Sequence, residues 1–276
     1  MASNYPGSLD SFDTIASDKK TSDAVGGRTH RQMHNDLGDA VEAVQAELGT
    51  DPAGTFATIK ARLDALVAYA AKTSAYTATV ADHTLNVTSG TFTLDLPAAS
   101  TCTGQSLKVK NSGTGVVTLD GNSSETVEGV ATFPLGKGSF IEITSTGSAW
   151  IQTGGTPDTG WRDVSSSFTV GYTSGAAFLR RVGSTVQVRT SSDLTPTLTN
   201  NDWNTVLSLP AGFRPAVNVD PVAWNAGFAG DMRRAYVSTA GDVRLMGAGA
   251  TVASMTLHAT FTTADSWPTS LPGSAA

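Results

Sequence analysis

The stretch TLNVTSGTFTLDLPAASTCTGQSLKVKNSGTGVVTLD, residues 84–120, decides the fold class of this chain. Its apolar residues recur at every second position in short runs such as TLNV, TFTLDL, SLKVK and VVTLD, and Gly, Asn and Ser separate the runs. This alternation is typical of half-buried β-strands joined by turns. The runs YTATV, FIEIT and AWIQ flank the stretch, so the pattern predicts a small all-β module over residues 75–154.

A second group of strand-like runs follows from Trp161, among them AFLRRV, TVQVRT and SMTLHATF. In RAYVSTAGDVRLMG the turn signal TAGD predicts a hairpin over residues 235–246. No lysine follows Lys137 and no glutamate follows Glu142, which indicates a separate unit. We expect a β-sandwich head over residues 155–276, with a Gly- and Pro-containing linker at residues 153–160 and a loose tail after Phe261.

Helical periodicity precedes the β modules, over residues 29–74. In THRQMHNDLGDAVEAVQAELG, residues 29–49, an apolar stripe with spacings of 4, 3 and 4 predicts a helix that Gly49 ends. A second helix is expected from an N-cap at Thr55 through Ala70, with a heptad-like seam. The apolar residues of the two stripes are Leu37, Val41, Val44, Leu48, Phe56, Ile59, Leu63 and Leu66.

Two short helices bury little as a lone hairpin, because isolated helices of this length are marginal in water. Self-association of several chains would supply the missing core. The residue types at the seam do not distinguish a dimer from a trimer. The alternative is a helical hairpin that packs on a neighbouring β domain.

Residues 1–28 show no sustained period and read as an extended arm that docks on a partner surface, or alternatively as a disordered tail. Their apolar and aromatic docking points are Tyr5, Leu9, Phe12 and Ile15. The segment lacks the basic start and apolar run of a signal peptide, and no later segment has 18 consecutive apolar residues. We expect synthesis in the cytoplasm and no membrane insertion.

The amino-acid composition and net charge limit the classes of function that we expect. Charged residues make up only 15% of the chain, which favours strands and turns over charged helices. The net charge of −6 gives no attraction to nucleic acid, because the necessary clusters of Lys and Arg are absent. The single cysteine, Cys102, excludes an intrachain disulfide and is expected to be a small buried side chain.

Metal and cofactor chemistry find little support in the sequence. His30 and His34 have the i, i+4 spacing of two metal ligands on one helix face, but the next residue on that face is Gly38. One chain therefore lacks a complete ligand shell, and a site would require histidines from aligned copies of the chain. We expect the pair to be solvated or capping residues. No P-loop and no dinucleotide fingerprint is present, so we expect no metal and no cofactor.

Catalytic patterns are equally weak. No G-x-S-x-G turn accompanies His258, which is expected to point away from the face of Met255 and Leu257. No carboxylate lies in the apolar surroundings that a glycosidase acid requires. We expect no enzyme and no catalytic residue.

The remaining expectation is that the protein recognises a partner through its surface. The stretches SSDLTPTLTNNDWN and DPVAWNAGFAGDMRR are expected to form long loops on the head. They carry Trp203, Trp224, Arg233 and Arg234, residue types that anchor interfaces and stack on ligands. These four residues are the receptor-binding candidates, with burial of each tryptophan in the core as the alternative.

Three stretches resemble tail fibres and minor tail proteins of tailed bacteriophages, of the sort common among phages of actinobacteria. They are NYPGSLDSF with HNDLGDAVEAVQAELGTDPAGTFATIKARLD, the repeat-like LDLPAASTCTGQSLKVKNSGTGVVTLDG, and the final GWRDV, FLRRVGSTVQVR and LPAGFRP. The resemblance implies a parallel homotrimer in the virion, joined to the particle by its N-terminus and trimerised by the helices. It also implies that the head contacts a host cell-surface receptor, with carbohydrate as one candidate.

The resemblance carries over no catalytic residue. It leaves two alternatives: a fibre or decoration protein on the capsid rather than the tail, and a carbohydrate-degrading tail spike. Tail attachment and adhesion are the primary expectation, for a chain that is mainly β with a short N-terminal helical segment.

Overall fold

A computed structural model describes residues 30–54, 57–65, 68–169, 175–191, 195–196, 198, 202–225, 232–247 and 255–276. The described chain is mainly β with few helices, as the sequence predicted. It divides into two compact units, Met1–Val67 and Ala68–Ala276. The expected docking points Tyr5, Leu9, Phe12 and Ile15 and the stripe residues Phe56 and Leu66 lie outside the described residues.

The first unit contains helix α1 (His30–Leu48). Gly49 ends it with a φ of +75°, and its backbone N–H donates a 2.9 Å hydrogen bond to the Gln45 carbonyl. Because positive φ costs glycine little, this residue is suited to terminate the helix as predicted. Three residues of the predicted stripe along α1 are exposed, Leu37 at 62%, Val44 at 58% and Leu48 at 42%, whereas Val41 is half-buried.

Helix α2 (Ile59–Ala65) is shorter than the sequence suggested. Its N-cap is Thr58, whose hydroxyl accepts a 3.0 Å hydrogen bond from the Ala61 N–H, and the predicted N-cap Thr55 lies outside the described residues. Leu63 on this helix is 58% exposed. The expected continuation to Ala70 is wrong, because Ala70 lies in a strand where it pairs with Leu85. Backbone pairing with the next strand therefore prevails over the heptad spacing.

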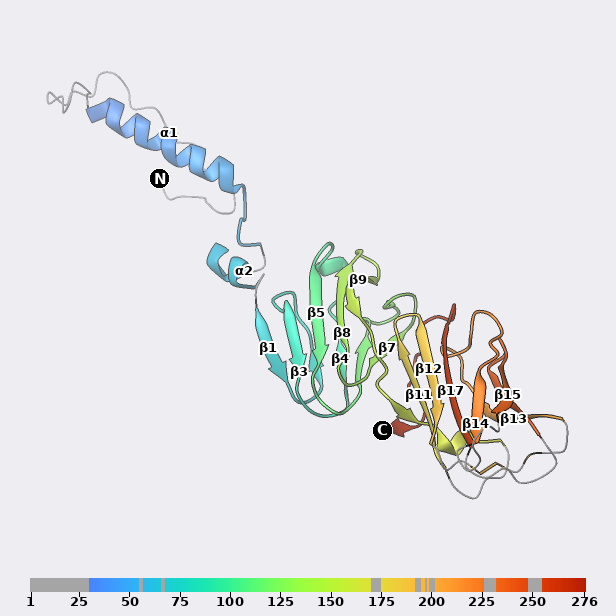
Figure 1. Ribbon diagram of the computed structural model, residues 1–276. Helices are drawn as coiled ribbons and strands as arrows, with labels where there is room; N and C mark the ends of the chain where they lie inside the picture. The colour runs from blue at the N-terminus through green and yellow to red at the C-terminus, as the bar shows by residue number, and fades with distance from the viewer. Residues whose placement is uncertain are drawn as a thin grey trace. The chain divides into compact units, whose positions relative to one another are not determined.

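The second unit begins with two facing sheets, between which the chain alternates (Figure 1). The five-stranded sheet has the order β1-β3-β5-β8-β9 and the four-stranded sheet the order β2-β4-β6-β7. The first three strands of each sheet are parallel, so this part of the chain runs as a two-sided coil. The strands are β1 (Tyr69–Lys72), β2 (Tyr76–Thr77), β3 (Thr84–Val87), β4 (Phe92–Asp95), β5 (Ser106–Asn111), β6 (Val117–Asp120), β7 (Thr132–Leu135), β8 (Phe140–Ser145) and β9 (Trp150–Thr156), with a short 3₁₀ helix η1 (Ala99–Thr101).

Side chains alternate between the two faces of each strand, and the inward-facing side chains of both sheets fill one hydrophobic core. Leu85, Leu94, Val109 and Leu119 are fully buried between the two sheets, as expected from the period of two. Cys102 is buried with them, which confirms its expected packing role, and burial raises the pKa of its thiol.

The remainder of the second unit is one nine-stranded sheet of order β13-β16-β15-β14-β17-β12-β11-β10-β18. It curls so that the segment after β10 returns to β13, where Phe168 forms a bridge with Leu207. A continuous curled sheet thus stands where two stacked sheets were expected. Its elements are β10 (Arg162–Asp163), η2 (Ser165–Ser167), β11 (Ala177–Val182), β12 (Thr185–Thr190), β13 (Trp203–Ser208), β14 (Val222–Asn225), β15 (Met232–Val237), β16 (Asp242–Met246), β17 (Met255–Thr262) and β18 (Ser274–Ala275).

Two details of this sheet confirm local predictions. Strands β15 and β16 form the predicted hairpin, in which Val237 pairs with Val243 across the TAGD turn. On β17 His258 is exposed, while Met255 and Leu257 are buried on the opposite face.

Residues 153–160 are not a linker. Strand β9 extends through Thr156, and Pro157, Asp158 and Thr159 are buried. The Asp158 carbonyl accepts a 2.7 Å hydrogen bond from the Gly136 N–H, and the Thr159 N–H donates to the Arg181 carbonyl at 3.0 Å. These contacts join the two sheet systems, so residues 68–276 form one unit instead of two separate modules.

The expected loose tail is also ordered. The Trp267 ring stacks on Phe133 with 5.1 Å between centroids, and its indole N–H donates a 2.9 Å hydrogen bond to the Pro134 carbonyl. Strand β18 pairs with β10 through Arg162 and Asp163. Local Gly, Pro and Ser content suggested a loop, but a buried aromatic side chain and a strand pair fix the segment.

Candidate ligand-binding site

Strands β13, β16 and β15 are neighbours in the curled sheet and share an outer face. Residues two apart on a strand point to the same side, so Arg234 and Tyr236 face outward while Ala235 and Val237 are buried. Tyr236 pairs directly with Arg244 on β16. The strand order therefore gathers side chains from three separate sequence segments.

A cavity of about 340 Å³ opens on this face. Its lining residues are Trp203, Asp220, Arg234, Tyr236 and Arg244. The rings of Trp203 and Tyr236 lie 6.0 Å apart with a tilt of 55°. Two aromatic rings, two guanidinium groups and a carboxylate thus surround one space of a size that suits a small ligand.

The two arginines differ in how their donors are used. Arg244 Nη2 lies 2.6 Å from Asp242 Oδ2, whereas the buried Arg244 Nε has no hydrogen-bond acceptor among the described residues. The Arg234 guanidinium carbon lies 5.6 Å from the centroid of the Trp203 ring, a cation–π contact. Arg234 is exposed, and no described residue forms a hydrogen bond or ion pair with its guanidinium.

An exposed apolar surface adjoins the cavity on β14 and β15. Val222 pairs with Arg234, and Trp224 pairs with Met232. Trp224 and Met232 are each 58% exposed, and Val222 is 45% exposed. Single exposed apolar residues are common on proteins, but a group of three beside a cavity indicates a contact surface.

The structure brings together three of the four predicted receptor-binding residues. Trp203 and Arg234 line the cavity and Trp224 lies on the same outer face. Arg233 does not join them, because alternation turns it to the opposite face, where it pairs with the buried Ala223. Trp203, Trp224 and the two arginines lie on strands rather than on the expected long loops.

Sequence reasoning missed Asp220, Tyr236 and Arg244 as site residues. The predicted hairpin over residues 235–246 held the signal for two of them, since its turn makes Tyr236 the partner of Arg244. Asp220 precedes β14 and had no local signal.

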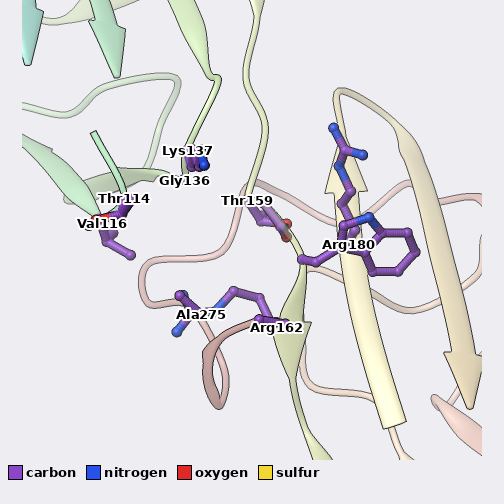
Figure 2. Close-up of a pocket in the computed structure, with 12 residues that line it drawn as sticks. Thr114, Val116, Gly136, Lys137, Thr159, Arg162, Arg180 and Ala275 are labelled. Carbon is purple, nitrogen blue, oxygen red and sulfur yellow. Dashed lines mark hydrogen bonds between the residues drawn. The ribbon is translucent and has the colours of Figure 1, made fainter. Parts of the chain in front are cut away.

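A second cavity, of about 270 Å³, lies between the two sheet systems of the second unit. Figure 2 shows Arg162 beside Ala275 at one side of this cavity and Lys137 at the other. Arg162 donates to the Pro272 and Gly273 carbonyls at 2.9 and 2.7 Å, and burial lowers the pKa of its guanidinium. Arg180 forms a two-bond pair with Asp158 at 3.0 and 2.5 Å, which raises its pKa. The arginine donors here are engaged in holding the fold.

A third cavity, of about 450 Å³, contains the carboxylates of Glu128 and Asp265. The Glu128 carboxylate accepts a hydrogen bond from the Gln152 N–H. Asp265 Oδ2 accepts from the Gly212 N–H at 2.9 Å and the Arg214 N–H at 3.2 Å. Both carboxylates are therefore bound to backbone amides and serve to position loops.

Within the described ranges, no three His, Cys, Asp or Glu side chains gather closely enough to hold a metal ion. His34 lies exposed on α1, and the side chain of His30 lies outside the described part. Neither described helix is long and apolar enough to cross a membrane.

Comparisons with known proteins give no further guide. No protein-family model matches the chain, and a search of curated proteins finds no match to it.

Proposed function

We propose that this chain is a structural virion protein, a short homotrimeric bacteriophage tail fibre whose C-terminal head binds the host surface. The observation that carries the adhesive role is the cavity of Trp203, Arg234, Tyr236 and Arg244, which faces outward beside an exposed apolar surface. Aromatic and arginine side chains dominate binding energy at protein surfaces, so this face is suited to recognition. The proposal that the protein is part of a virion rests on the resemblance of its sequence to phage tail proteins.

The helical stripe supports self-association. Leu37, Val44 and Leu48 face solvent along one side of α1, an arrangement typical of a helix that packs against other helices. Burial of their exposed halves contributes about 1 kcal/mol per side chain, roughly half of the value for complete burial. Three such side chains in three chains contribute about 9 kcal/mol to a trimer on the same basis.

Trimerisation would serve adhesion directly. Three heads on one stalk raise the effective concentration of each binding site at a repetitive cell surface. Weak individual contacts then give lasting attachment.

The oligomer is tested by multi-angle light scattering on the whole chain. We expect the wild type to be a trimer and the double variant Leu37→Asp, Val44→Asp to be monomeric. The matched control is Ala43→Asp, Ala46→Asp, which adds the same charge at exposed positions off the stripe and should stay trimeric. A monomeric wild type, or a trimer that survives the stripe variant, would refute the assembly proposed.

The virion role is tested by gold-labelled antibody against the head on particles of the phage that encodes the chain. Label on the tail supports the proposal. Label on the capsid would replace it with the capsid-fibre alternative, and unlabelled particles in which the protein is also undetected by mass spectrometry would refute a structural role.

A further inference from the structure

We infer that the cavity lined by Trp203, Asp220, Arg234, Tyr236 and Arg244 binds a sugar that carries a carboxylate, a uronic acid unit of an acidic glycan. The inference deepens the proposed surface-binding role of the head and rests on it. Different groups of the cavity match different parts of this ligand.

The carboxylate follows from unused guanidinium donors. Arg234 has no hydrogen-bond or ion-pair partner among the described residues, and the buried Nε of Arg244 has no acceptor there. Because the Arg244 Nε is buried, the donors that are open to a ligand oxygen are those of the exposed Arg234. Planar guanidinium groups pair best with planar carboxylates, through two parallel hydrogen bonds.

The sugar ring follows from the aromatic walls. Trp203 and Tyr236 both line the cavity, with 6.0 Å between their ring centroids. Apolar C–H faces of a pyranose pack on such rings, while the hydroxyl groups at the edge of the sugar remain free to form hydrogen bonds. Asp220 lines the same cavity and supplies a carboxylate acceptor for those hydroxyls.

The combination excludes simpler ligands. A neutral sugar would leave the arginine donors with weak hydroxyl acceptors only. A peptide carboxylate would offer no row of hydroxyls to Asp220. A polyphosphate would bring a second negative charge toward Asp220 and no apolar face for Trp203. A uronic acid unit satisfies all three groups at once.

The neighbouring surface fits a polymer rather than a single sugar. Val222, Trp224 and Met232 continue the outer face beyond Arg234, and all three are exposed. Further sugar rings of a chain would stack on Trp224.

Isothermal titration of the full-length protein at physiological salt tests this site. The probes are trisaccharides of galacturonate, mannuronate and hyaluronan type, each paired with its neutral methyl ester, together with poly(glycerol phosphate). We expect at least one acidic trisaccharide to bind at least tenfold more tightly than its ester. Failure of all three acids, equal binding of acid and ester, or binding of poly(glycerol phosphate) alone would overturn the inference.

Variants locate the binding. Arg234→Gln should lose at least tenfold in affinity, and Arg234→Lys should lose less because it keeps the charge without the planar fork. The control Arg189→Gln removes an exposed arginine that stacks on Trp161, 4.1 Å from the ring centroid, on the same sheet. It should bind like the wild type. Unchanged affinity in both Arg234 variants, with folding verified by circular dichroism, would place the ligand elsewhere and refute the site.

Light scattering on the same samples separates this inference from the proposed function. If the protein is a trimer present on virions but binds none of the acidic sugars, the ligand inference is refuted and the proposed fibre function stands. If it is a monomer that binds the acidic sugar through Arg234, the proposed fibre function is refuted and the ligand inference stands.

Discussion

Replacement of Trp267 by alanine should destabilise the Ala68–Ala276 unit by about 4 kcal/mol, in the range observed when a large buried aromatic side chain is removed. Trp267 is only 7% exposed, stacks on Phe133 and lies beneath the Arg181 guanidinium, 5.0 Å from its carbon. Its removal leaves a cavity where the two sheet systems meet.

The hydrogen bond of the Trp267 indole contributes a part of this loss of stability that can be measured separately. The indole N–H donates to the Pro134 carbonyl in a buried position. Trp267→Phe keeps most of the apolar contact and removes the donor. It should therefore cost about 1–3 kcal/mol, the range for a buried polar group left without its partner.

Urea unfolding followed by far-ultraviolet circular dichroism measures both losses. Trp224→Ala is the matched control, because it makes the same change at a side chain that is 58% exposed, and it should shift stability by less than about 0.5 kcal/mol. A loss below about 1 kcal/mol in Trp267→Ala would show that the segment after Phe261 does not hold the unit together, contrary to its contacts.

Two further perturbations test local contacts of the same unit. Asp158→Asn should cost about 2 kcal/mol in urea unfolding because it weakens the charge-assisted bonds to Arg180, whereas the control Asp242→Asn, at a more exposed pair with Arg244, should cost less than about 1 kcal/mol. Equal losses would contradict the importance of burial. Burial raises the pKa of the Cys102 thiol, so the folded chain keeps it protonated at a pH where the unfolded chain forms thiolate. Alkylation by iodoacetamide at mildly alkaline pH should thus be much slower in the folded protein than in urea, and equal rates would be inconsistent with the buried thiol.

Local alternation predicted the strands and many of their faces. In MTLHATF the period of two correctly buried Met255 and Leu257 and exposed His258. The same period carries no information on whether neighbours run parallel or antiparallel, so the two-sided coil of β1 to β6 was not predicted. The heptad-like spacing predicts Ala70 in the helix, four residues after Leu66, and only its pairing with Leu85 reveals the strand.

The errors at residues 153–160 and after Phe261 have a common cause. Gly, Pro and Ser describe local backbone preference, whereas Trp267 is fixed by Phe133 and Pro134 far earlier in the chain. Residue type alone pointed to Trp203 and Arg234, which line the cavity, and their role in receptor binding stays a prediction. Arg233 was chosen as a candidate together with Arg234, although alternation along the strand turns their side chains to opposite faces. Asp220 could be recognised as a lining residue only from the folded structure.

The contact between Trp267 and Pro134 also sets an order of events during synthesis. The two residues are 133 positions apart, so the ribosome needs roughly 10 s at ordinary elongation rates to deliver the tryptophan after the proline. Throughout that interval the Pro134 carbonyl and the Phe133 ring are without their final cover. A nascent chain with an uncovered strand edge associates readily with its neighbours, and chains made together on one message would spend this interval side by side.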